Sequence, residues 1–381
     1  MSEKVIVIAH FVSTLSQGSG SMAVLMNYFR HIDKKQVRFD FLYFRETPEE
    51  TSYHDEIRRL GGKCVCIGEP SLVPANIKRV EKFFRQSEYS ILHVHEVYLT
   101  FWIAPIAKRA GISAVIAHSH MTQFGDVPWK AVRNRMLCLP ASYLSDYKCA
   151  CSNAAAKAYF GNSVIQSNRY FLVHNAVNPM LYRFSGEDRK RYREEFGLAD
   201  NDMVLGHIGR LVPQKNQEFL LEVFSILHEY DSKLKLLIIG DGYLRDRLKE
   251  ICRSLKLDNF TIWGGVRTDA PRIYNAFDAF FLPSLFEGLP NVLIEAQCNG
   301  LPCFMSTAIT REAVILGTCR SVDIRKGAAY CAEQIKPYLH GLSRDENAVL
   351  EIAKAGYDIS VESGRLLEFY KRVLRETAHE N

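Results

Sequence analysis

Short apolar runs alternate with amphipathic stretches along most of the chain. The first series of apolar runs comprises KVIVIAH (4–10), VRFDFLYF, KCVCI, SILHVH, SAVIAHSH and YKCAC. A second series comprises MVLGHIG (203–209), LKLLIIG (234–240), FTIWGG (260–265), DAFFLP (278–283) and LPCFMS (301–306). Continuously apolar strands separated by helices are typical of parallel sheets that are covered on both faces. The pattern therefore predicts an α/β protein with two parallel sheets of similar size.

The alternation is interrupted near residue 170. The segment NRYFLVHNAVNPMLYRFSGEDRK combines a short strand pattern with a polar, proline-containing stretch. We expect the domain boundary here, with a first domain over 1–178 and a second over 179–360. Residues 361–381 then form a separate terminal helix, because one face of this segment is apolar. The apolar positions of that face are Leu366, Leu367, Phe369, Tyr370, Val373 and Leu374.

The composition is that of an ordinary globular protein, with 47% apolar and 24% charged residues among 381. The net charge of +5 is too small to indicate nucleic acid, but it suits anionic nucleotides or an anionic membrane surface. The N-terminal apolar run is too short for a signal peptide, and no stretch approaches the length of a membrane span. The ten cysteines show no zinc-finger spacing. We therefore expect reduced thiols in a cytoplasmic protein.

The most distinctive stretch is PSLFEGLPNVLIEAQCNGLP (283–302), in which Glu287 and Glu295 stand eight positions apart. We predict a strand end, a loop, and a helix that begins at Pro290, because proline suits the first helical position. Glu295 would then lie roughly 7 Å along the helix axis from the helix start. Two carboxylates beside backbone N–H groups suit a ligand with hydroxyls and phosphates. The alternative is that Glu295 only caps or solvates a surface helix.

This stretch resembles the E-x7-E signature of the retaining glycosyltransferases of family 4, which have the GT-B fold. Other segments follow the order of that family, namely AHSH, VHNAVN, GRLVPQKN, IIGDG and STAITREA. The resemblance covers nearly the whole chain and is strongest to the bacterial branch that builds capsules and exopolysaccharides. It implies two Rossmann-like domains facing a central cleft, an acceptor-binding domain followed by a nucleotide-sugar-binding domain. It also implies that the C-terminal helix crosses back to the first domain.

The segment GHIGRLVPQKNQEFL (206–220) is the second strong motif. Gly209 and Arg210 follow a predicted strand, and Lys215 lies at the start of a helix. Arginine gives bidentate contacts to oxygen and lysine a compact charge, so Arg210 and Lys215 together suit a leaving diphosphate. The alternative is a pair of surface charges beside a helix start. In the resembling family, the backbone at the positions of Val266 and Arg267 holds the nucleotide base.

The loop Gly18-Ser19-Gly20-Ser21 follows the first predicted strand. Such a loop lets backbone N–H groups approach a phosphate at a helix N-terminus, although a flexible turn is an equal alternative. The family usually has Gly-Gly-x-Glu here, whereas this chain has Ser19 and Met22 in the first and last of those roles. Gly20 and Ser21 remain candidate diphosphate contacts, and any role of the acidic residue is lost.

The segment AHSHMT (117–122) carries His118 and His120. Our interpretation is that these two side chains point to opposite faces of the strand, so that only one faces the cleft. The family places a histidine against the donor sugar at this strand end. His120 fits that position best and His118 second, with the alternative of one structural and one surface histidine. Metal ligation is not expected here, because no acidic residue or cysteine is close in sequence.

The resemblance implies a metal-independent transfer that needs no cofactor. Asp200-Asn201-Asp202 looks like a metal-binding D-x-D motif of another fold, but it precedes a strand and is interpreted as a turn. The predicted catalytic residues are His120, Arg210, Lys215 and Glu287. The predicted donor-binding residues are Gly20, Ser21, Gly209, Val266, Arg267, Gly288, Leu289, Pro290, Asn291 and Glu295.

The predicted function is the transfer of a sugar, with retention, from a UDP-linked or other nucleotide-diphosphate donor to a saccharide acceptor. A lipid-linked acceptor in capsule or exopolysaccharide synthesis is expected. The alternatives are a GT-B sugar-nucleotide 2-epimerase and a non-catalytic partner subunit of another transferase. Contact with the cytoplasmic face of the inner membrane would use 77–86 or 127–136, two basic and apolar stretches that otherwise read as packed amphipathic helices. No function is predicted for 313–345.

Overall fold

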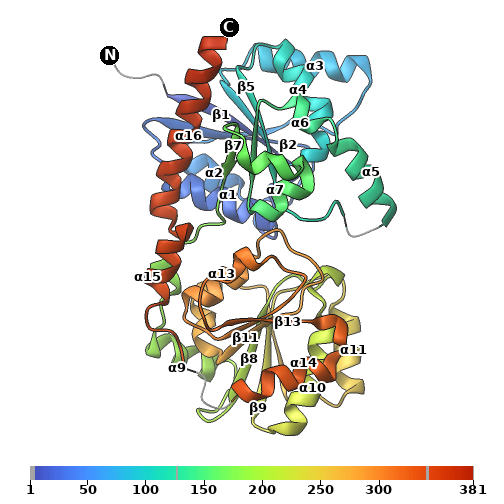
Figure 1. Ribbon diagram of the computed structural model, residues 1–381, viewed down its shortest axis with the longest axis vertical. Coiled ribbons are helices and arrows are strands. Elements are labelled where there is room, and N and C mark those ends of the chain that lie inside the picture. The colour runs from blue at the N-terminus through green and yellow to red at the C-terminus, as the bar shows by residue number, and fades with distance from the viewer. Residues whose placement is uncertain (1–4, 126–127, 340–342, 381) are drawn as a thin grey trace. The chain divides into compact units, whose positions relative to one another are not determined.

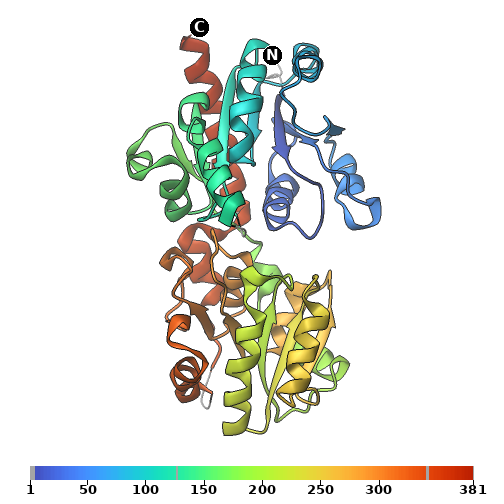
Figure 2. The same ribbon diagram turned by 90° about the vertical axis from the view of Figure 1, so that its right-hand side faces the viewer.

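The computed structural model describes residues 5–125, 128–339 and 343–380. The chain forms two compact units. The first comprises Met1–Ala176 together with Ile359–Asn381, and the second comprises Val177–Asp358. These boundaries each lie two residues before the expected ends at 178 and 360. In each unit, helices cover both faces of one sheet (Figures 1 and 2).

The first unit contains a seven-stranded sheet in the order β3-β2-β1-β4-β5-β6-β7, and all its strand pairs are parallel. Its strands are β1 (Ile6–Val12), β2 (Val37–Tyr43), β3 (Cys64–Cys66), β4 (Ile91–Val94), β5 (Ala114–Ser119), β6 (Tyr147–Ala150) and β7 (Tyr170–Leu172). Its helices are α1 (Gly20–His31), α2 (His54–Arg59), α3 (Pro74–Arg85), α4 (Thr100–Arg109), α5 (Pro128–Cys138), α6 (Ala141–Leu144), α7 (Asn153–Phe160) and α16 (Ile359–Glu380).

The second unit contains a six-stranded parallel sheet in the order β10-β9-β8-β11-β12-β13. Its strands are β8 (Met203–Ile208), β9 (Leu234–Ile239), β10 (Thr261–Gly265), β11 (Ala279–Leu282), β12 (Cys303–Ser306) and β13 (Cys319–Val322). Its helices are α8 (Pro179–Tyr182), α9 (Gly186–Glu195), α10 (Gln217–Tyr230), α11 (Arg245–Ser254), α12 (Ala270–Ile273), α13 (Asn291–Cys298), α14 (Ala328–Ile335) and α15 (Ala348–Ile352). The predicted pair of doubly wound parallel sheets is confirmed.

Alternation along β1 shows how the first core is built. Ile8 and Val12 belong to one apolar cluster, whereas Val7, Ala9 and Phe11 belong to another. Successive side chains of a strand point to opposite faces, so one apolar run supplies both layers. This is the physical reason why the strands of the sequence read as continuous apolar runs.

The terminal helix α16 packs within the first unit, along the same layer as α1 (Figure 1). Its Tyr370 is fully buried, and the hydroxyl oxygen lies 2.8 Å from Nδ1 of His93. Tyr147 of β6 donates a hydrogen bond to Glu376 near the end of the helix. The predicted return of the C-terminal helix to the first domain is therefore seen in these contacts.

Two further expectations concern local features. All ten cysteines are free, as the sequence analysis predicts. Among the described residues, no helix combines the length and apolar character that crossing a membrane requires. One boundary differs from its prediction: Pro290 is the N-cap of α13, and Asn291 is its first residue. The ψ of 113° at Pro290 is extended, so the helix starts one position later than expected.

Candidate functional site

The candidate site of the second unit lies where the strand order reverses. The chain leaves β8 toward β9 on one side, and β11 later pairs with the other side of β8. Loops that leave neighbouring strands in opposite directions create a crevice at the carboxyl edge of a parallel sheet. Gly209, Arg210 and Lys215 follow β8, and Glu287 follows β11. The two strongest sequence motifs therefore meet at this reversal.

Lys215 and Glu287 form an ion pair within the reversal. Lys215 Nζ donates a hydrogen bond to Glu287 Oε1 over 2.6 Å, and the two side chains are only 13% and 8% exposed. Gln214 Nε2 donates to Glu287 Oε2 at 3.2 Å and to the Phe286 carbonyl at 3.1 Å. The backbone N–H of Leu285 donates to the Gln214 carbonyl at 2.8 Å. These contacts fix the position of the Glu287 carboxylate before any ligand arrives.

Asn216 shapes the turn that carries Lys215. Its φ of 57° and ψ of 44° are left-handed, a conformation in which asparagine is enriched among non-glycine residues. This turn separates a 3₁₀ segment, Pro213–Lys215, from α10. The Asn216 side chain donates from Nδ2 to the Pro283 carbonyl at 3.2 Å. The asparagine of the K-N motif thus has a structural role in joining the two loops.

A buried polar chain holds the backbone that follows β8. Gln217 Nε2 donates to the Arg210 carbonyl at 2.8 Å and lies 3.2 Å from His207 Nε2. His207 Nδ1 lies 3.0 Å from the Phe281 carbonyl, so this nitrogen carries the proton. Burial lowers the pKa of His207 to about 4, which keeps the imidazole neutral. Sequence reasoning missed His207 and Gln217, although both stand inside the motif that it singled out.

The turn Gly240-Asp241-Gly242 supports the same backbone. Gly240 has a φ of 132°, and a Cβ there would lie 2.0 Å from the Gly209 carbonyl oxygen. The backbone N–H of Leu211 donates to the Asp241 carbonyl at 3.0 Å. The glycines are therefore required by the close approach of two loops.

Arg210 differs from Lys215 in its surroundings. Its side chain is exposed, and no side chain in the described part of the chain bonds to its guanidinium group. The Lys215 charge is offset by Glu287, whereas the Arg210 charge faces solvent. Arg210 is therefore ready to meet an anion without first breaking an internal contact.

Glu295 lies on α13, and the charge of Lys215 influences the pKa of its carboxyl group. Tyr274 donates from its hydroxyl to Glu295 Oε2 at 2.7 Å. Burial raises the pKa of Glu295, while hydrogen bonds from Tyr274 and Tyr182 and the charge of Lys215 act in the opposite direction. Glu295 is thus held by the buried Tyr274, and the alternative that it merely solvates a surface helix does not describe its environment. Gly288, Leu289 and Pro290 are buried ahead of it.

The predicted base-binding residues lie after the edge strand β10. Val266 is 76% exposed. The Arg267 guanidinium forms ion pairs with Asp269 at 2.6 Å and Glu195 at 2.5 Å, and its hydrogen bond to Asp269 lowers the pKa of that carboxyl group. The Arg267 side chain is therefore held by carboxylates of the second unit. The predicted base contact through the backbone of these two residues stays a prediction.

The segment 313–345 carried no prediction, and its residues 340–342 lie outside the described part of the chain. Its described residues hydrogen-bond to α13 and to the residue that follows the helix. The Gln297 side chain donates to the Ala313 carbonyl at 2.8 Å and accepts from the backbone N–H groups of Ile315 and Leu316. Arg344 donates to Asn299 and, at 2.6 Å, to the Phe277 carbonyl. Burial lowers the pKa of Arg344 to about 9.

Asp200-Asn201-Asp202 is a turn, as the sequence analysis predicts. The Asp202 carboxylate accepts from the Ala199 N–H at 2.8 Å, and the Asp202 carbonyl accepts from Arg193 at 2.6 Å. Both contacts stabilise the turn that leads into β8.

In the first unit, Ser19 caps α1, which begins at Gly20. The Ser19 hydroxyl oxygen accepts from the Met22 N–H at 3.4 Å and lies 3.1 Å from the Ser21 hydroxyl. The serine that stands in a glycine position of the family pattern is therefore an N-cap. Gly20 is exposed at the helix start, where an anion would meet backbone N–H groups.

Five histidines gather where β1, β4 and β5 end. They form two hydrogen-bonded rows. His10 Nδ1 lies 3.0 Å from His95 Nε2, and His95 Nδ1 lies 2.8 Å from His120 Nε2. In the second row, His93 Nε2 lies 3.1 Å from His118 Nδ1. Burial lowers the pKa of His10 to about 3 and of His120 to about 4, so both rings are neutral at neutral pH.

The expectation that His118 and His120 point to opposite faces was wrong. Their rings stack with centroids 4.0 Å apart. Residues two apart on a strand share a face, and the same rule applies to His93 and His95, whose centroids are 4.5 Å apart. The H-x-H pairs of two neighbouring parallel strands therefore predict the cluster, and this was the signal that sequence reasoning missed.

Two overlapping histidine trios have a geometry that a metal ion could use. His10, His93 and His95 form one, and His95, His118 and His120 form the other, with one ring nitrogen from each member within 4.8 Å of the others. Imidazole nitrogens suit zinc and other transition metals. However, both ring nitrogens of His95 and one each of His10, His93, His118 and His120 already lie within hydrogen-bonding distance of another histidine, whereas His10 Nε2 and His118 Nε2 have no partner among the described residues. Neither trio includes a carboxylate or thiolate.

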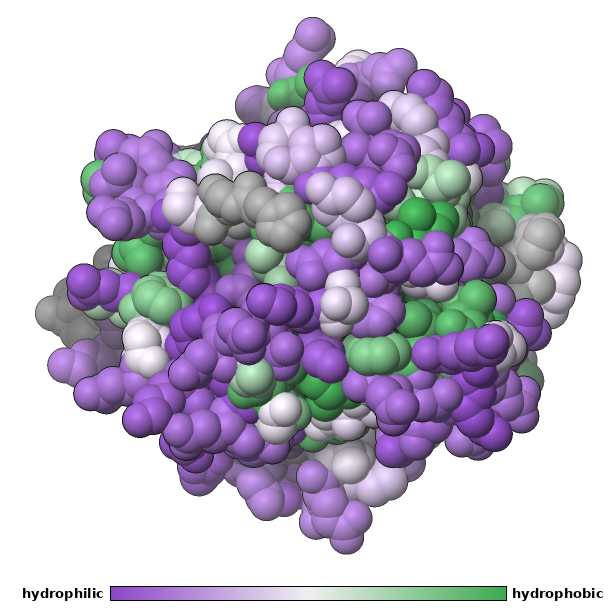
Figure 3. All heavy atoms as spheres, turned by 90° about the horizontal axis from the view of Figure 1, so that it is seen from below, coloured by the Kyte–Doolittle hydropathy of each residue, from purple (hydrophilic) through white to green (hydrophobic). Residues whose placement is uncertain are grey.

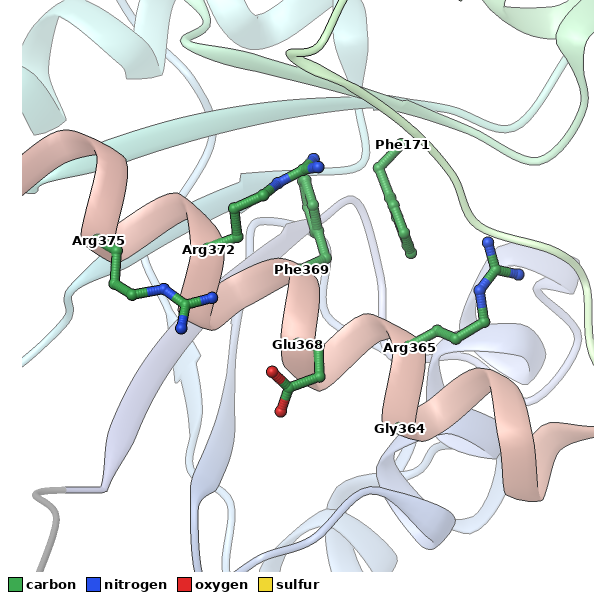
Figure 4. Close-up of a pocket in the computed structure, with 7 residues that line it drawn as sticks. All are labelled: Phe171, Gly364, Arg365, Glu368, Phe369, Arg372 and Arg375. Atoms are coloured by element: carbon green, nitrogen blue, oxygen red, sulfur yellow. The ribbon is translucent and has the colours of Figure 1, made fainter.

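Gly20, Ser21 and His120 belong to the first unit, and the other predicted site residues belong to the second. Figure 4 shows a hollow in the first unit between α16 and β7, and none of the predicted site residues lines it. There Phe171 and Phe369 stack with centroids 4.4 Å apart, and Arg365 and Arg372 lie near these rings. These contacts anchor α16, so the hollow is a feature of helix packing.

Comparison with known proteins places these observations in a family. Residues 19–181 match the family described as Glycosyltransferase Family 4, and residues 188–318 match Glycosyl transferases group 1. The chain is 31% identical over 376 residues to a protein of Bacillus subtilis (strain 168) that is named as a glycosyltransferase, EpsF. That match covers 95% of this chain and 96% of EpsF.

A second relative is the Escherichia coli UDP-Gal:alpha-D-GlcNAc-diphosphoundecaprenol alpha-1,3-galactosyltransferase. It is 26% identical over 313 residues, covering 78% of this chain and 79% of that enzyme. Among solved structures, Anabaena Alr3699/HepE in complex with UDP and glucose has a TM-score of 0.78 at 17% identity, covering 96% of this chain and 100% of HepE. Sucrose-phosphate synthase from Thermosynechococcus elongatus also has a TM-score of 0.78, at 14% identity, with 97% and 100% covered. These matches favour a transferase over the epimerase and partner-subunit alternatives. The chain is therefore a member of glycosyltransferase family 4, with the GT-B fold.

Proposed function

We propose that this glycosyltransferase moves a sugar, with retention of anomeric configuration, from a UDP-linked donor to a lipid-linked saccharide. The product would belong to a capsule or exopolysaccharide. The observation that carries the proposal is the Lys215–Glu287 pair at the β8/β11 reversal, with the exposed Arg210 on the same loop. This arrangement combines cations for a diphosphate with a positioned carboxylate for sugar hydroxyls.

The leaving group explains the basic residues. As the bond between the anomeric carbon and the diphosphate oxygen breaks, negative charge grows on that oxygen. Arg210, Lys215 and the N-terminus of α13 would stabilise this charge without a metal ion. The new bond forms on the same face of the sugar, and the acceptor hydroxyl passes its proton to the departing diphosphate. The step therefore requires neither a protein nucleophile nor a cofactor.

The two glutamates would bind hydroxyl groups of the donor. Glu287 would bind hydroxyls of the transferred sugar, and Glu295 would bind the ribose of the nucleotide. Lys215 is the link between the two roles, because its ammonium group is paired with Glu287 and also influences Glu295. A bound diphosphate would draw Lys215 away from Glu287 and leave that carboxylate free to accept from the sugar.

The first unit would supply the remaining contacts. Gly20 and Ser21 would meet the diphosphate at the start of α1, and His120 would contact the donor sugar. The row His10–His95–His120 supports this role, because it fixes the orientation of the His120 ring. With its pKa lowered by burial, His120 would act as a neutral hydrogen-bonding group.

The choice of UDP and of a lipid-linked acceptor rests on the relatives. The name of the Escherichia coli relative specifies UDP-Gal and a diphosphoundecaprenol-linked acceptor, and HepE was solved with UDP. A lipid-linked acceptor would bring the protein to the cytoplasmic face of the inner membrane as a peripheral protein.

The test begins with thermal stabilisation by a panel of nucleotide sugars. The stabilising donor is then incubated with lipid-linked saccharides, with and without EDTA, and the anomeric configuration of the product is read by NMR. We expect UDP-sugars to stabilise the protein and the product to keep the donor's α or β configuration. Stabilisation by no nucleotide sugar, or inversion at the anomeric carbon, would contradict the proposal. The same transfer assay is run on Lys215→Ala, which should be impaired. Arg247→Ala, which removes an exposed cation on α11, is its matched control.

A further inference from the structure

A line of exposed apolar side chains runs along α5 and α6. These large side chains are Trp129, Val132, Met136, Leu139 and Tyr143, and they are 61–89% exposed. Their spacing alternates between three and four residues, so the members on α5 share one face of the helix. Large apolar side chains that share one exposed face mark an interaction site more strongly than the same residues scattered singly.

This line is not the face by which the helices pack on the first unit. Cys138 and Ala141 are buried and pack with Val97. Asn134 donates from Nδ2 to the Phe124 carbonyl at 2.7 Å. The helices therefore have a covered face that anchors them, and the exposed line is a second apolar face. Figure 1 shows α5 at the margin of the first unit.

The charges beside this line are all positive. Lys130, Arg133 and Arg135 are exposed, and the sequence contains no aspartate or glutamate from residue 128 to 145. Lys130 Nζ lies 5.6 Å and Arg133 Cζ 5.5 Å from the centroid of Trp129. A tryptophan between two cations suits the boundary between lipid headgroups and acyl chains.

The other basic and apolar stretch, 77–86 on α3, is different. Val80 and Phe84 are 1% and 2% exposed in the core, and Phe83 packs against the same cluster. Its apolar residues are thus used for folding, as expected for a packed amphipathic helix.

On the face of the molecule seen in Figure 3, hydrophilic side chains dominate and apolar ones form small separate groups.

We propose that the α5–α6 face docks the protein on an anionic lipid bilayer. The helices would lie in the membrane plane, with Trp129, Val132 and Met136 among the upper acyl chains and the three cations at the headgroups. The positive charge of the face identifies the partner as an anionic surface, since a second copy of this chain would present the same charges. The proposal gives the lipid-linked acceptor a defined surface, but its evidence is independent of the transfer reaction.

The experiment is sedimentation of the full-length protein with vesicles of phosphatidylcholine containing 30% phosphatidylglycerol (about a third anionic lipid). No sugar donor is present, so the result does not depend on the proposed function. We expect binding to these vesicles and little binding to pure phosphatidylcholine. The double substitution Trp129→Glu and Met136→Glu should abolish binding. Arg133→Gln and Arg135→Gln together should weaken it roughly 30-fold, at about 1 kcal/mol per basic residue.

Fluorescence distinguishes insertion from loose adsorption. Trp102 is buried and Trp263 is partly buried, so Trp129 is the exposed tryptophan of the chain. We expect its emission to shift to shorter wavelength on binding and to be quenched by lipids brominated near the headgroup. Tyr243→Glu, on an exposed tyrosine of the second unit, is the matched control and should bind normally. Unchanged vesicle binding in the α5 variants, or loss of a dimer in place of vesicle binding, would overturn the proposal.

Discussion

Lys215 of the β8 loop and Glu287 of the β11 loop, 72 residues apart, are joined by a 2.6 Å contact between Nζ and Oε1. In the proposed mechanism, Lys215 would bind the diphosphate and Glu287 the sugar, so altering either residue would also affect its partner. Lys215→Ala should reduce the turnover number on the order of a hundred-fold or more, because it removes a preorganised charge from the leaving group. Steady-state kinetics with the identified donor measure this. Near-normal turnover would show that Lys215 has no role in the reaction.

The same pair predicts a stability coupling. Removing one partner leaves a charge with little access to solvent, so Lys215→Met and Glu287→Leu should each lower the free energy of unfolding by about 1–3 kcal/mol. The double variant should lose less than the sum of the two, since no unpaired charge remains. Urea denaturation of the four proteins measures the coupling. Additive losses would mean that the ion pair contributes nothing to stability.

Arg344 should be important for the stability of the second unit. It donates to several backbone carbonyl groups around 274–277 and to Asn299. Arg344→Met would remove several hydrogen bonds from this region at once and should cost about 2–4 kcal/mol of unfolding free energy. Arg253→Met, on the exposed side of α11, is the control. A loss below 1 kcal/mol, roughly the size of a surface effect, would contradict this role of Arg344.

The histidine cluster predicts acid sensitivity. Burial lowers the pKa of His10 to about 3 and of His120 to about 4, and it lowers the pKa of His93, His95 and His118 as well. An unfolded histidine has a pKa of about 6.5, so below that pH the unfolded chain binds protons that the folded chain does not. The contribution of these histidines to the free energy of unfolding should therefore be fully present above about pH 6.5 and should fall progressively toward pH 4.

Chemical denaturation at a series of pH values measures this loss. His10→Phe should flatten the pH dependence, because it removes one of the protons taken up on unfolding. His31→Gln, at an exposed position of α1, should leave it unchanged. Equal slopes in His10→Phe and the unsubstituted protein would exclude His10 as a source of the effect.

The histidine trios give an expectation for metals. A divalent cation would place two positive charges among buried neutral rings with no carboxylate ligand, and it would break the contacts between the rings. We expect the purified protein to bind Co²⁺ no more tightly than His95→Ala, measured by visible absorption. A stoichiometric tetrahedral cobalt spectrum that disappears in His95→Ala would refute this expectation.

The two sheets could be predicted from the sequence, and so could the meeting of its two strongest motifs. Both depend on patterns that are local in the chain. Apolar runs mark the strands, and the carboxyl ends of neighbouring parallel strands must meet. Side-chain partners were less accessible. The hydrogen bond from Tyr274 to Glu295 and the buried polar chain through His207 depend on packing between distant elements. The histidine cluster was missed because the facing rule for strands was misapplied to His118 and His120.

The first unit is built from both ends of the chain, since α16 completes a core that begins with β1. During synthesis, the second unit has all of its residues before the first has its last helix. Until α16 is synthesised, Phe39 and His93 lack their contacts with Tyr370. We infer that the second unit can fold while the nascent first unit still lacks α16, so the core of the first unit is completed only after the second unit has been synthesised.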